Sequence, residues 1–334
     1  MDSSRTDDVA RNHDFKNRFL KPFAGLVAIS LLFIGVVQVT MNWMAVFGVT
    51  VLVLPGFLLG AVSAAFAFWW SGLRYGAGVA AAFVACLITL AALLLLGLEG
   101  LLAVVAMTPL LAALAAVGAS AAYVASRWYR AHGRAAVASA VLLTCTPFFA
   151  GLEGQIQSGP KLRTISTEIV MDASRQDIWD QIATTTTLRE PDHWFFRWGA
   201  GYPMHIDVEG EGVGSWRLDE FPTGVYELVV TEWDEPERMA FSVAAQPIPL
   251  NNINPFHGEL RQPRLEEGVY SKRGEFHLRE TDDGVVVRAT SWYYNAMVPN
   301  FYWGGIVDRI IQQMHLLILE DIEEGLEERR AAEA

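Results

Sequence analysis

Three residues of this chain have the type and setting that acid–base chemistry could use. His193 opens the run His193-Trp194-Phe195-Phe196-Arg197-Trp198, and a histidine can act as a general base near neutral pH. Asp207 follows His205 by two residues, a spacing that lets both face one side of a strand. Tyr293 lies in the run Trp292-Tyr293-Tyr294 and offers one hydroxyl among apolar neighbours. His193, Asp207 and Tyr293 are therefore the catalytic candidates, but none has a second residue that would define a reaction.

The aromatic run that begins at His193 allows two interpretations. It can form a short helix that packs against the rim of a sheet. It can also form the mouth of a cavity or an aromatic belt at a lipid surface, where amphipathic rings gather. In the second interpretation Trp194 lines a ligand site.

Motifs for metals, nucleotides and nucleophilic catalysis are absent from the sequence. The chain has no HExxH, P-loop or nucleophile-elbow pattern, and Gly210, Gly212 and Gly214 lack the spacing of a dinucleotide fingerprint. Two potential ligands, His205 and Asp207, are too few for a metal site. The two cysteines, Cys86 and Cys145, both lie in apolar runs. The sequence therefore predicts no metal and no cofactor.

Charge and hydropathy divide the chain into two different halves. The full chain is 52% hydrophobic and only 19% charged, against about 25% charged for an ordinary soluble protein. Residues 1–152 have a net charge of +4, whereas residues 153–334 have a net charge of −16. An acidic second half argues against nucleic acid as a partner, because phosphate binding needs a basic surface.

The first half has the composition of a membrane region. Five apolar runs, each close to the ~20 residues that a helix needs to cross a bilayer, occupy about 22–41, 44–70, 75–97, 100–125 and 135–152. The pair Gly56 and Gly60 and an Ala/Gly-rich stretch at 112–122 favour close helix packing. The spans contain no buried ionisable residue that would indicate transport, since Glu99 lies at a junction between two runs. The first half therefore predicts an anchor in the lipid bilayer, with a pore as the alternative.

The basic residues predict the orientation of these spans. All nine Lys and Arg residues of the first half lie in the N-terminal tail or in the connections after the second and fourth runs. Because such residues gather on the cytoplasmic side, the N-terminus is predicted to be cytoplasmic. Five crossings then put the C-terminal half on the non-cytoplasmic side, and one re-entrant run would reverse that result.

The second half changes to short alternating segments with turn residues between them. Ser174 and Asp177 form a capping box for a helix that buries Ile178 and Ile182. A long amphipathic helix is predicted at about 300–328. Strands are predicted at 163–171, 203–209, 213–220, 224–233, 238–244, 269–280 and 285–295.

The turn Thr281-Asp282-Asp283-Gly284 allows the two faces of the last hairpin to be assigned. If Glu280 pairs with Val285, one face of the sheet carries alternate residues of both strands. That inner face then comprises Phe276, Leu278, Val287, Ala289, Ser291 and Tyr293, and His277 points outward. These six residues, together with Trp194 and Met314 of the last helix, are the predicted ligand-binding set.

The order of elements predicts a curved antiparallel sheet covered by the C-terminal helix, an α+β helix-grip fold. This arrangement resembles the START-like, SRPBCC superfamily of polyketide cyclases/dehydrases and lipid-transport proteins. The resemblance depends on the runs Ile169–Ser174, Asp177–Asp180, Gly212–Trp216, Val230–Arg238 and Thr290–Tyr294. It covers about 163–328 and implies a cavity between sheet and helix for a hydrophobic or amphipathic small molecule.

One connection departs from the pattern of that superfamily. Residues 245–268 form a long Pro-containing segment, and loops of this length are usually either functional or disordered. An ordered segment could form part of the cavity mouth or rest on the membrane.

The sequence thus predicts a multi-pass membrane protein with a START-like binding module. The expected division is a cytoplasmic tail (1–21), a transmembrane helical region (22–152), a linker (153–162), the helix-grip domain (163–328) and a tail (329–334). The function expected is binding of a lipid or another hydrophobic molecule. A cyclase/dehydratase-like enzyme and an interaction or assembly protein of the membrane are the alternatives.

Overall fold

The chain folds into two compact units in a computed structural model. The structure describes residues 20–44, 49–129, 141, 145, 146, 149, 159–260, 268–297 and 299–333. The helical unit comprises Met1–Ser158 and Asn254–His257, and the sheet unit comprises Gly159–Ile253 and Gly258–Ala334.

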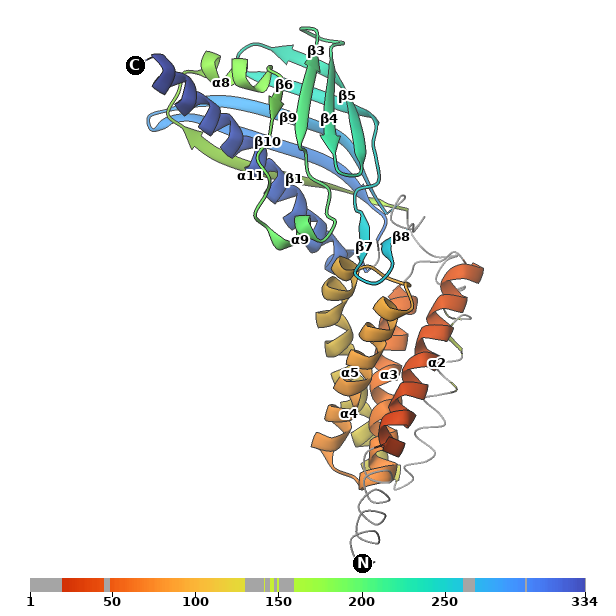
Figure 1. The fold of residues 1–334 in the computed structure, drawn as a ribbon. Helices are drawn as coiled ribbons and strands as arrows, with labels where there is room; N and C mark the ends of the chain where they lie inside the picture. Colours follow the sequence, from red (N-terminus) through yellow and green to blue (C-terminus); the bar gives the residue numbers. More distant parts are fainter. Residues whose placement is uncertain are drawn as a thin grey trace, which may run out of the picture. The chain divides into compact units, whose positions relative to one another are not determined.

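The helical unit contains four long apolar helices among its described residues (Figure 1). They are α2 (Lys21–Met44), α3 (Val49–Ser71), α4 (Tyr75–Leu95) and α5 (Leu101–Tyr129). Each is long and apolar enough to cross a membrane, which supports a membrane protein. The first four expected runs are confirmed as helices. The fifth, at 135–152, lies almost entirely outside the described residues.

Small residues bring α3 and α5 into direct backbone contact. A Cβ atom built on Gly60 would lie 2.0 Å from the carbonyl oxygen of Ala115, and one built on Gly118 would lie 1.9 Å from that of Phe57. No side chain fits at either position. Small residues that let two helix backbones approach this closely are typical of helix pairs that pack in membranes.

Four residues of the long Pro-containing connection belong to the helical unit. The side-chain amide of Asn254 donates to the carbonyl oxygens of Leu94 and Glu99, at 2.9 and 2.8 Å. The Nε2 atom of His257 lies 2.9 Å from the carbonyl oxygen of Leu95. These contacts satisfy carbonyl groups at and beyond the C-terminal end of α4, which have no partner within the helix. This part of the connection is therefore ordered.

The sheet unit contains one eight-stranded antiparallel sheet in the order β1-β10-β9-β6-β5-β4-β3-β2. Its strands are β1 (Lys161–Met171), β2 (Thr186–Thr187), β3 (His205–Glu209), β4 (Trp216–Phe221), β5 (Gly224–Asp234), β6 (Arg238–Ala245), β9 (Val269–Thr281) and β10 (Gly284–Asn295). Two further strands, β7 (Asn252–Asn254) and β8 (Gly258–Leu260), form a separate hairpin. The seven predicted strands are confirmed, whereas β2, β7 and β8 were not predicted because segments of two or three residues show no period.

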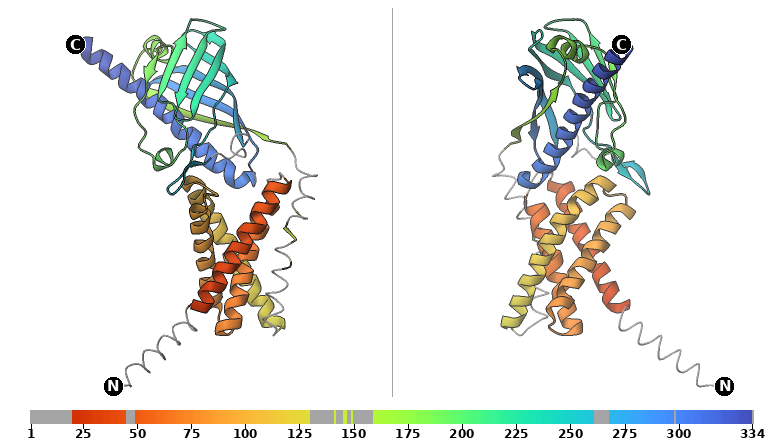
Figure 2. Two further views of the ribbon diagram at one scale, coloured as in Figure 1. Left: turned by 45° about the vertical axis from the view of Figure 1, so that its right-hand side comes forward. Right: turned by 90° about the vertical axis from the view of Figure 1, so that its left-hand side faces the viewer.

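Three helices complete the sheet unit: α8 (Arg175–Ile182), α9 (Trp194–Arg197) and α11 (Asn300–Glu333). The predicted cap of α8 is present, since the hydroxyl of Ser174 accepts a hydrogen bond from the backbone N–H of Asp177. Figure 2 shows the sheet curling around α11, which crosses its concave side.

The core of the sheet unit lies between that concave side and α11. It contains Trp179 of α8, residues Phe276, Leu278 and Val287 of the sheet, and Leu319 of α11. The hairpin register is as predicted, with Val285 opposite Glu280. An antiparallel sheet with one apolar face needs a cover, and the apolar stripe of α11 supplies it. The architecture is a helix-grip fold.

Backbone contact at Gly60 gives a test of the packing in the helical unit. We expect Gly60→Val to destabilise the chain by about 3 kcal/mol, because the new side chain pushes α3 away from α5. Thermal unfolding of the full chain in detergent measures the effect. Gly76→Val is the matched control, since nothing lies within 4 Å of a Cβ atom there, and an equal loss of stability in both variants would contradict the packing.

Candidate functional site

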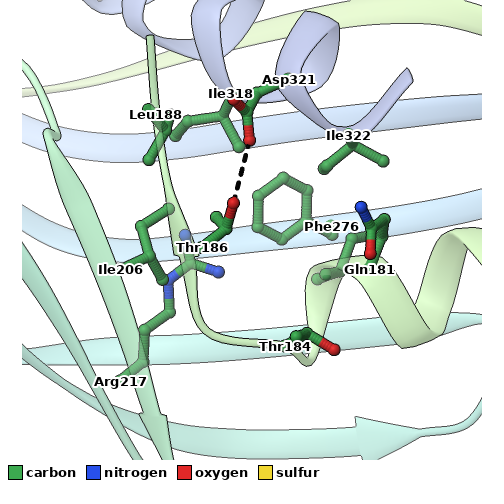
Figure 3. Close-up of a pocket in the computed structure, with 11 residues that line it drawn as sticks. Gln181, Thr184, Thr186, Leu188, Ile206, Arg217, Phe276, Ile318, Asp321 and Ile322 are labelled. Atoms are coloured by element: carbon green, nitrogen blue, oxygen red, sulfur yellow. Dashed lines mark hydrogen bonds between the residues drawn. The ribbon is translucent and has the colours of Figure 1, made fainter. Parts of the chain in front are cut away.

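A small cavity lies between α11 and the concave face of the sheet (Figure 3). Its volume is about 10 Å³, roughly the space of one water molecule. Apolar walls come from Ile182, Leu188, Ile206, Phe276, Ile318 and Ile322, and polar groups come from Gln181, Thr184, Thr186, Arg217 and Asp321. The sequence led us to expect a cavity that accepts a small molecule, whereas the gap at this place holds no more than one water molecule and side chains fill most of the interior.

A buried ion pair borders this cavity. Arg217 of β4 has a side chain that is 3% exposed, and its Nε donates to Oδ1 of Asp219 at 2.8 Å. The two residues are two apart on one strand and therefore point to the same face. Burial raises the pKa of Asp219, while the charge and the hydrogen bond of Arg217 act to lower it.

The guanidinium group of Arg217 lies against aromatic rings on the cavity side. Its Cζ atom is 5.5 Å from the ring centre of Phe241 and 5.6 Å from that of Phe276. In Figure 3 this group points toward the centre of the lining residues, beside Thr186. A cation in this place can meet the polar end of a molecule whose apolar part contacts the walls.

Asp321 of α11 supplies the opposite charge on the helix side of the cavity. It accepts a hydrogen bond from the hydroxyl of Thr186 at 3.3 Å. Burial raises the pKa of Asp321, the hydrogen bond from Thr186 acts to lower it, and the negative charge of Glu324 raises it further. The cavity therefore carries one cationic group from the sheet and one acidic group from the helix.

A second polar cluster joins α11 to β1 and β10. The Nε2 atom of His315 lies 2.7 Å from the hydroxyl of Ser291, and its Nδ1 atom lies 3.2 Å from the hydroxyl of Thr167. Burial lowers the pKa of His315 to about 4, so the ring is neutral at pH 7. Since a hydroxyl can donate or accept, both ring nitrogens have partners in either tautomer. The sequence treats His315 as an isolated residue, and only the fold brings its partners together.

A third polar cluster lies near the beginning of α11. The hydroxyl of Tyr293, which is fully buried, donates to Oδ1 of Asp308 at 2.5 Å. Arg163 donates to the same oxygen from Nε at 3.2 Å and also pairs with Oδ2. Burial acts to raise the pKa of Asp308, but the hydrogen bonds from Arg163 and Tyr293 outweigh it and lower that pKa.

The environment of Tyr293 keeps its hydroxyl protonated. Burial raises the pKa of this phenol, and the hydrogen bond to the Asp308 carboxylate raises it further. The cluster therefore holds an ionised carboxylate between a phenol and a guanidinium group, an arrangement that fixes α11 on the sheet.

The structure puts the predicted ligand-binding residues at the cavity, in the core, in the polar clusters and at the surface. Phe276 lines the cavity, while Leu278, Val287 and Ala289 are buried in the core beneath α11. Ser291 and Tyr293 make the polar contacts described above, and Met314 packs against Tyr293, Val307 and Ile311. Trp194 is 48% exposed and lies at the first position of α9.

The other two catalytic candidates lie away from the cavity. Asp207 is on the face of β3 opposite to the buried Ile206, and it accepts a hydrogen bond from the hydroxyl of Thr185 at 2.8 Å. His193 precedes α9, where its Nε2 atom contacts Oε1 of Gln313. The structure therefore does not bring the three candidates into one group.

Sequence reasoning missed the charged residues of the site, which are Arg217, Asp219 and Asp321, as well as the uncharged polar residues Gln181, Thr184 and Thr186. The turn Phe221–Gly224 pairs Arg217 with Leu228 and Asp219 with Tyr226. A register argument like the one used for the last hairpin, applied to this turn, would have put both charges on the inner face. Nothing in the sequence marks Asp321, which lies among many acidic residues at the end of α11.

Among the residues that the structure describes, no group of three or more His, Cys, Asp or Glu side chains could hold a metal ion. The site is thus a mainly apolar interior with a buried ion pair and hydroxyl groups.

Comparison with solved structures gives neighbours over the C-terminal half of the chain. No family model matches the chain, and no curated protein matches it. A point mutant of norcoclaurine synthase from Thalictrum flavum is 18% identical with a TM-score of 0.34, and the match covers 52% of this chain and 99% of that one. Protein MLL2253 from Mesorhizobium loti is 13% identical with a TM-score of 0.31, over 50% and 98% of the two chains. Protein NE0264 from Nitrosomonas europaea is 11% identical with a TM-score of 0.32, over 50% and 96%.

The class of the second half is defined by its own topology. A curled antiparallel sheet with β1 beside β10, gripping a long C-terminal helix, is the helix-grip arrangement. In this chain that domain follows four apolar helices, each long enough to cross a membrane.

Burial of a neutral histidine predicts a pH dependence of stability. The pKa of His315 falls from about 6.5 in the unfolded chain to about 4 in the folded one. The unfolded state binds the proton more tightly than the folded state. The buried neutral ring of His315 therefore adds its full contribution to the free energy of unfolding above pH 6.5, and this contribution is lost as the pH falls toward 4. The loss amounts to roughly 3 kcal/mol. We expect the thermal midpoint of the wild-type chain to fall more steeply over this range than that of His315→Gln, and parallel curves would contradict the assignment.

The buried ion pair gives a second prediction. Arg217→Met leaves Asp219 buried without its partner and should destabilise the chain by about 3–5 kcal/mol. The double variant Arg217→Met/Asp219→Leu removes both charges and should recover most of that loss. Arg288→Met, which removes an exposed ion pair with Glu168, is the control and should change stability by less than about 1 kcal/mol. Unfolding followed by tryptophan fluorescence measures all three, and no recovery in the double variant would contradict the pairing.

Proposed function

We propose that this chain is a membrane-anchored binding module for a lipid or another hydrophobic or amphipathic small molecule. The bound molecule lies between the concave face of the sheet and α11. The observation that carries this proposal is the water-sized gap at that place, which has apolar walls and the buried guanidinium group of Arg217 on its border.

The ion pair of Arg217 and Asp219 supports a ligand site because burying two charges in a protein core costs free energy. Desolvation of a buried pair often exceeds the attraction between its charges, and apolar replacements are frequently neutral or stabilising. A charge beside an apolar cavity has a use where it orients the polar end of a ligand. Arg217 would serve that purpose for a carboxylate or another anionic headgroup.

The cavity must expand to receive such a ligand. Small-molecule sites usually have volumes of about 300–1,000 Å³, far above the 10 Å³ found here. Ile318 and Ile322 of α11 face the gap, so a shift of α11 or new rotamers of these side chains would open it. Binding therefore proceeds with a movement at the helix.

None of the acid and base candidates from the sequence lines the cavity, and the carboxyl group that does, that of Asp321, accepts a hydrogen bond from Thr186. This distribution favours binding over catalysis. An enzyme of the cyclase/dehydratase kind needs an acid or base at the reacting atoms. Of the candidates from the sequence, Asp207 lies on the outer face of β3, and the hydroxyl of Tyr293 is held by Asp308. An interaction or assembly role is the outcome that remains if no small molecule binds.

The four apolar helices support the anchoring part of the proposal. The cytoplasmic placement of the N-terminus and the non-cytoplasmic placement of the sheet unit remain predictions from the basic residues and from a count of five crossings.

Photolabelling with a diazirine-bearing fatty acid tests the ligand site in the full chain. The probe is added to purified protein in detergent, activated by light, and located by mass spectrometry of peptides. We expect adducts on β4, β9 and α11, and we expect them to disappear with excess oleate. Adducts confined to α2–α5 would contradict the proposal, because those helices contact any lipid.

Two variants make this test specific for the cavity. Ile206→Trp fills the gap and should lower the adduct yield on β4, β9 and α11 about tenfold, since a bound ligand of ordinary size loses more than 1.4 kcal/mol by such exclusion. Val213→Trp adds the same side chain at a position that is 68% exposed and should leave the yield unchanged.

A further inference from the structure

At one end of the sheet unit, the ends of three strands and the first turn of α11 lie together. Lys161 at the beginning of β1 lies opposite Asn295 at the end of β10, which in turn lies opposite Val269 at the beginning of β9. The first turn of α11 joins them, because the side-chain amide of Asn300 donates to the carbonyl oxygen of Asn295 at 3.3 Å. The C-terminus of α11 lies at the other end of this unit (Figure 1).

Apolar and aromatic side chains are exposed at this end. Phe301 is 80% exposed, Leu162 is 48% exposed and Tyr270 is 36% exposed. We call the group the aromatic end, and it comprises Leu162, Tyr270, Tyr294, Phe301, Tyr302 and Trp303.

The aromatic end has the composition of a surface that meets lipid headgroups. The rings of Tyr270 and Tyr294 stack with centres 4.9 Å apart, and Nζ of Lys272 lies 5.8 Å from the ring centre of Tyr294. Amphipathic rings and lysines with long apolar stems are enriched at membrane–water interfaces. Exposed apolar side chains that gather in one place, as Phe301, Leu162 and Tyr270 do, often mark a surface that contacts a partner or a membrane.

Charge differs sharply between the two ends of α11. From Asn300 to Leu319 its only acidic residue is Asp308, which pairs with Arg163. From Glu320 onward it carries seven acidic residues: Glu320, Asp321, Glu323, Glu324, Glu327, Glu328 and Glu333. The helix of 34 residues is about 50 Å long, so these charges lie far from the aromatic end. Negatively charged lipid phosphates repel the acidic second half of α11 but not the first half, whose one carboxylate is paired with Arg163.

Chain length also favours contact between the aromatic end and a bilayer. Lys161 follows the last apolar run of the sequence, which ends at about residue 152, by only eight intervening residues. Eight residues span at most about 29 Å. The beginning of β1 is therefore tethered near any membrane that holds this run.

We propose that the aromatic end binds the surface of a phospholipid bilayer, with Phe301 and Leu162 inserted among the headgroups and Lys161 and Lys272 beside lipid phosphates. This inference rests on the proposed membrane anchoring of the first half. It adds a second, peripheral lipid contact that orients the binding module, with α11 leading away from the lipid toward its acidic end.

Site-directed fluorescence in nanodiscs tests the contact with the full chain. Cys86 and Cys145 are replaced by alanine, and one cysteine is introduced as Phe301→Cys or Leu162→Cys and labelled with the environment-sensitive dye NBD. Val213→Cys is the matched control, because Val213 is 68% exposed in the turn between β3 and β4, at the other end of the sheet. The nanodiscs contain phosphatidylcholine and phosphatidylglycerol, with or without lipids that carry a doxyl quencher.

The inference predicts a blue-shifted emission and a severalfold loss of intensity with doxyl lipids for the dye at 301 and 162. The dye at 213 should show neither effect and should instead be quenched by iodide from solution. Equal quenching at 301 and 213 in chains that have entered the nanodiscs would overturn the lipid contact alone. A chain that does not co-elute with nanodiscs would overturn the membrane anchoring and, with it, this contact.

Discussion

The structure of the second half depends on one constraint: the concave apolar face of the sheet must be covered, and α11 covers it. Leu319, Ile322 and Leu326 of this helix are buried against Trp179 and the inner-face residues of β9 and β10. If α11 were absent, the sheet would expose that core together with the charges of Arg217 and Asp219. The fold, the cavity and the proposed binding movement all follow from how closely this one helix lies against the sheet.

The same helix carries different chemistry along its length. Its first turn exposes the aromatic ring of Phe301. Asp308 and His315 then contact β1 and β10, and Ile318 and Asp321 line the cavity. The two polar clusters fix its first half by directional hydrogen bonds, whereas the cavity is bordered mainly by apolar contacts. The movement proposed above would have to displace the apolar contacts of Ile318 and Ile322 together with the hydrogen bond from Thr186 to Asp321.

The helical unit and the sheet unit solve the packing problem in different ways. In the sheet unit, large side chains such as Trp179 and Phe276 fill the interior. In the helical unit, Gly60 and Gly118 allow α3 and α5 to meet at their backbones. The difference is the one expected for the proposed membrane anchor, because water drives large apolar groups into a core, whereas helices in lipid associate through close contact of small residues.

The sequence by itself determined the elements and much of their arrangement. Apolar runs without charges defined four helices, the pair Ser174–Asp177 marked the beginning of α8, and the turn Thr281–Gly284 set the register that puts Phe276, Leu278 and Val287 inside. These features are local, because each depends on periodicity or on a turn of a few residues. The short strands β2, β7 and β8 have no period and exist only through their partners.

Tertiary structure alone decided which polar residues meet and how much space remains between them. His315 lies 148 residues from Thr167 and 24 from Ser291, and no sequence pattern links such distant positions. The size of the cavity could not be predicted from the sequence either, because it depends on how the side chains of Ile206, Phe276 and Ile318 pack together. Periodicity fixes the direction in which a side chain points, whereas packing in three dimensions determines what it touches.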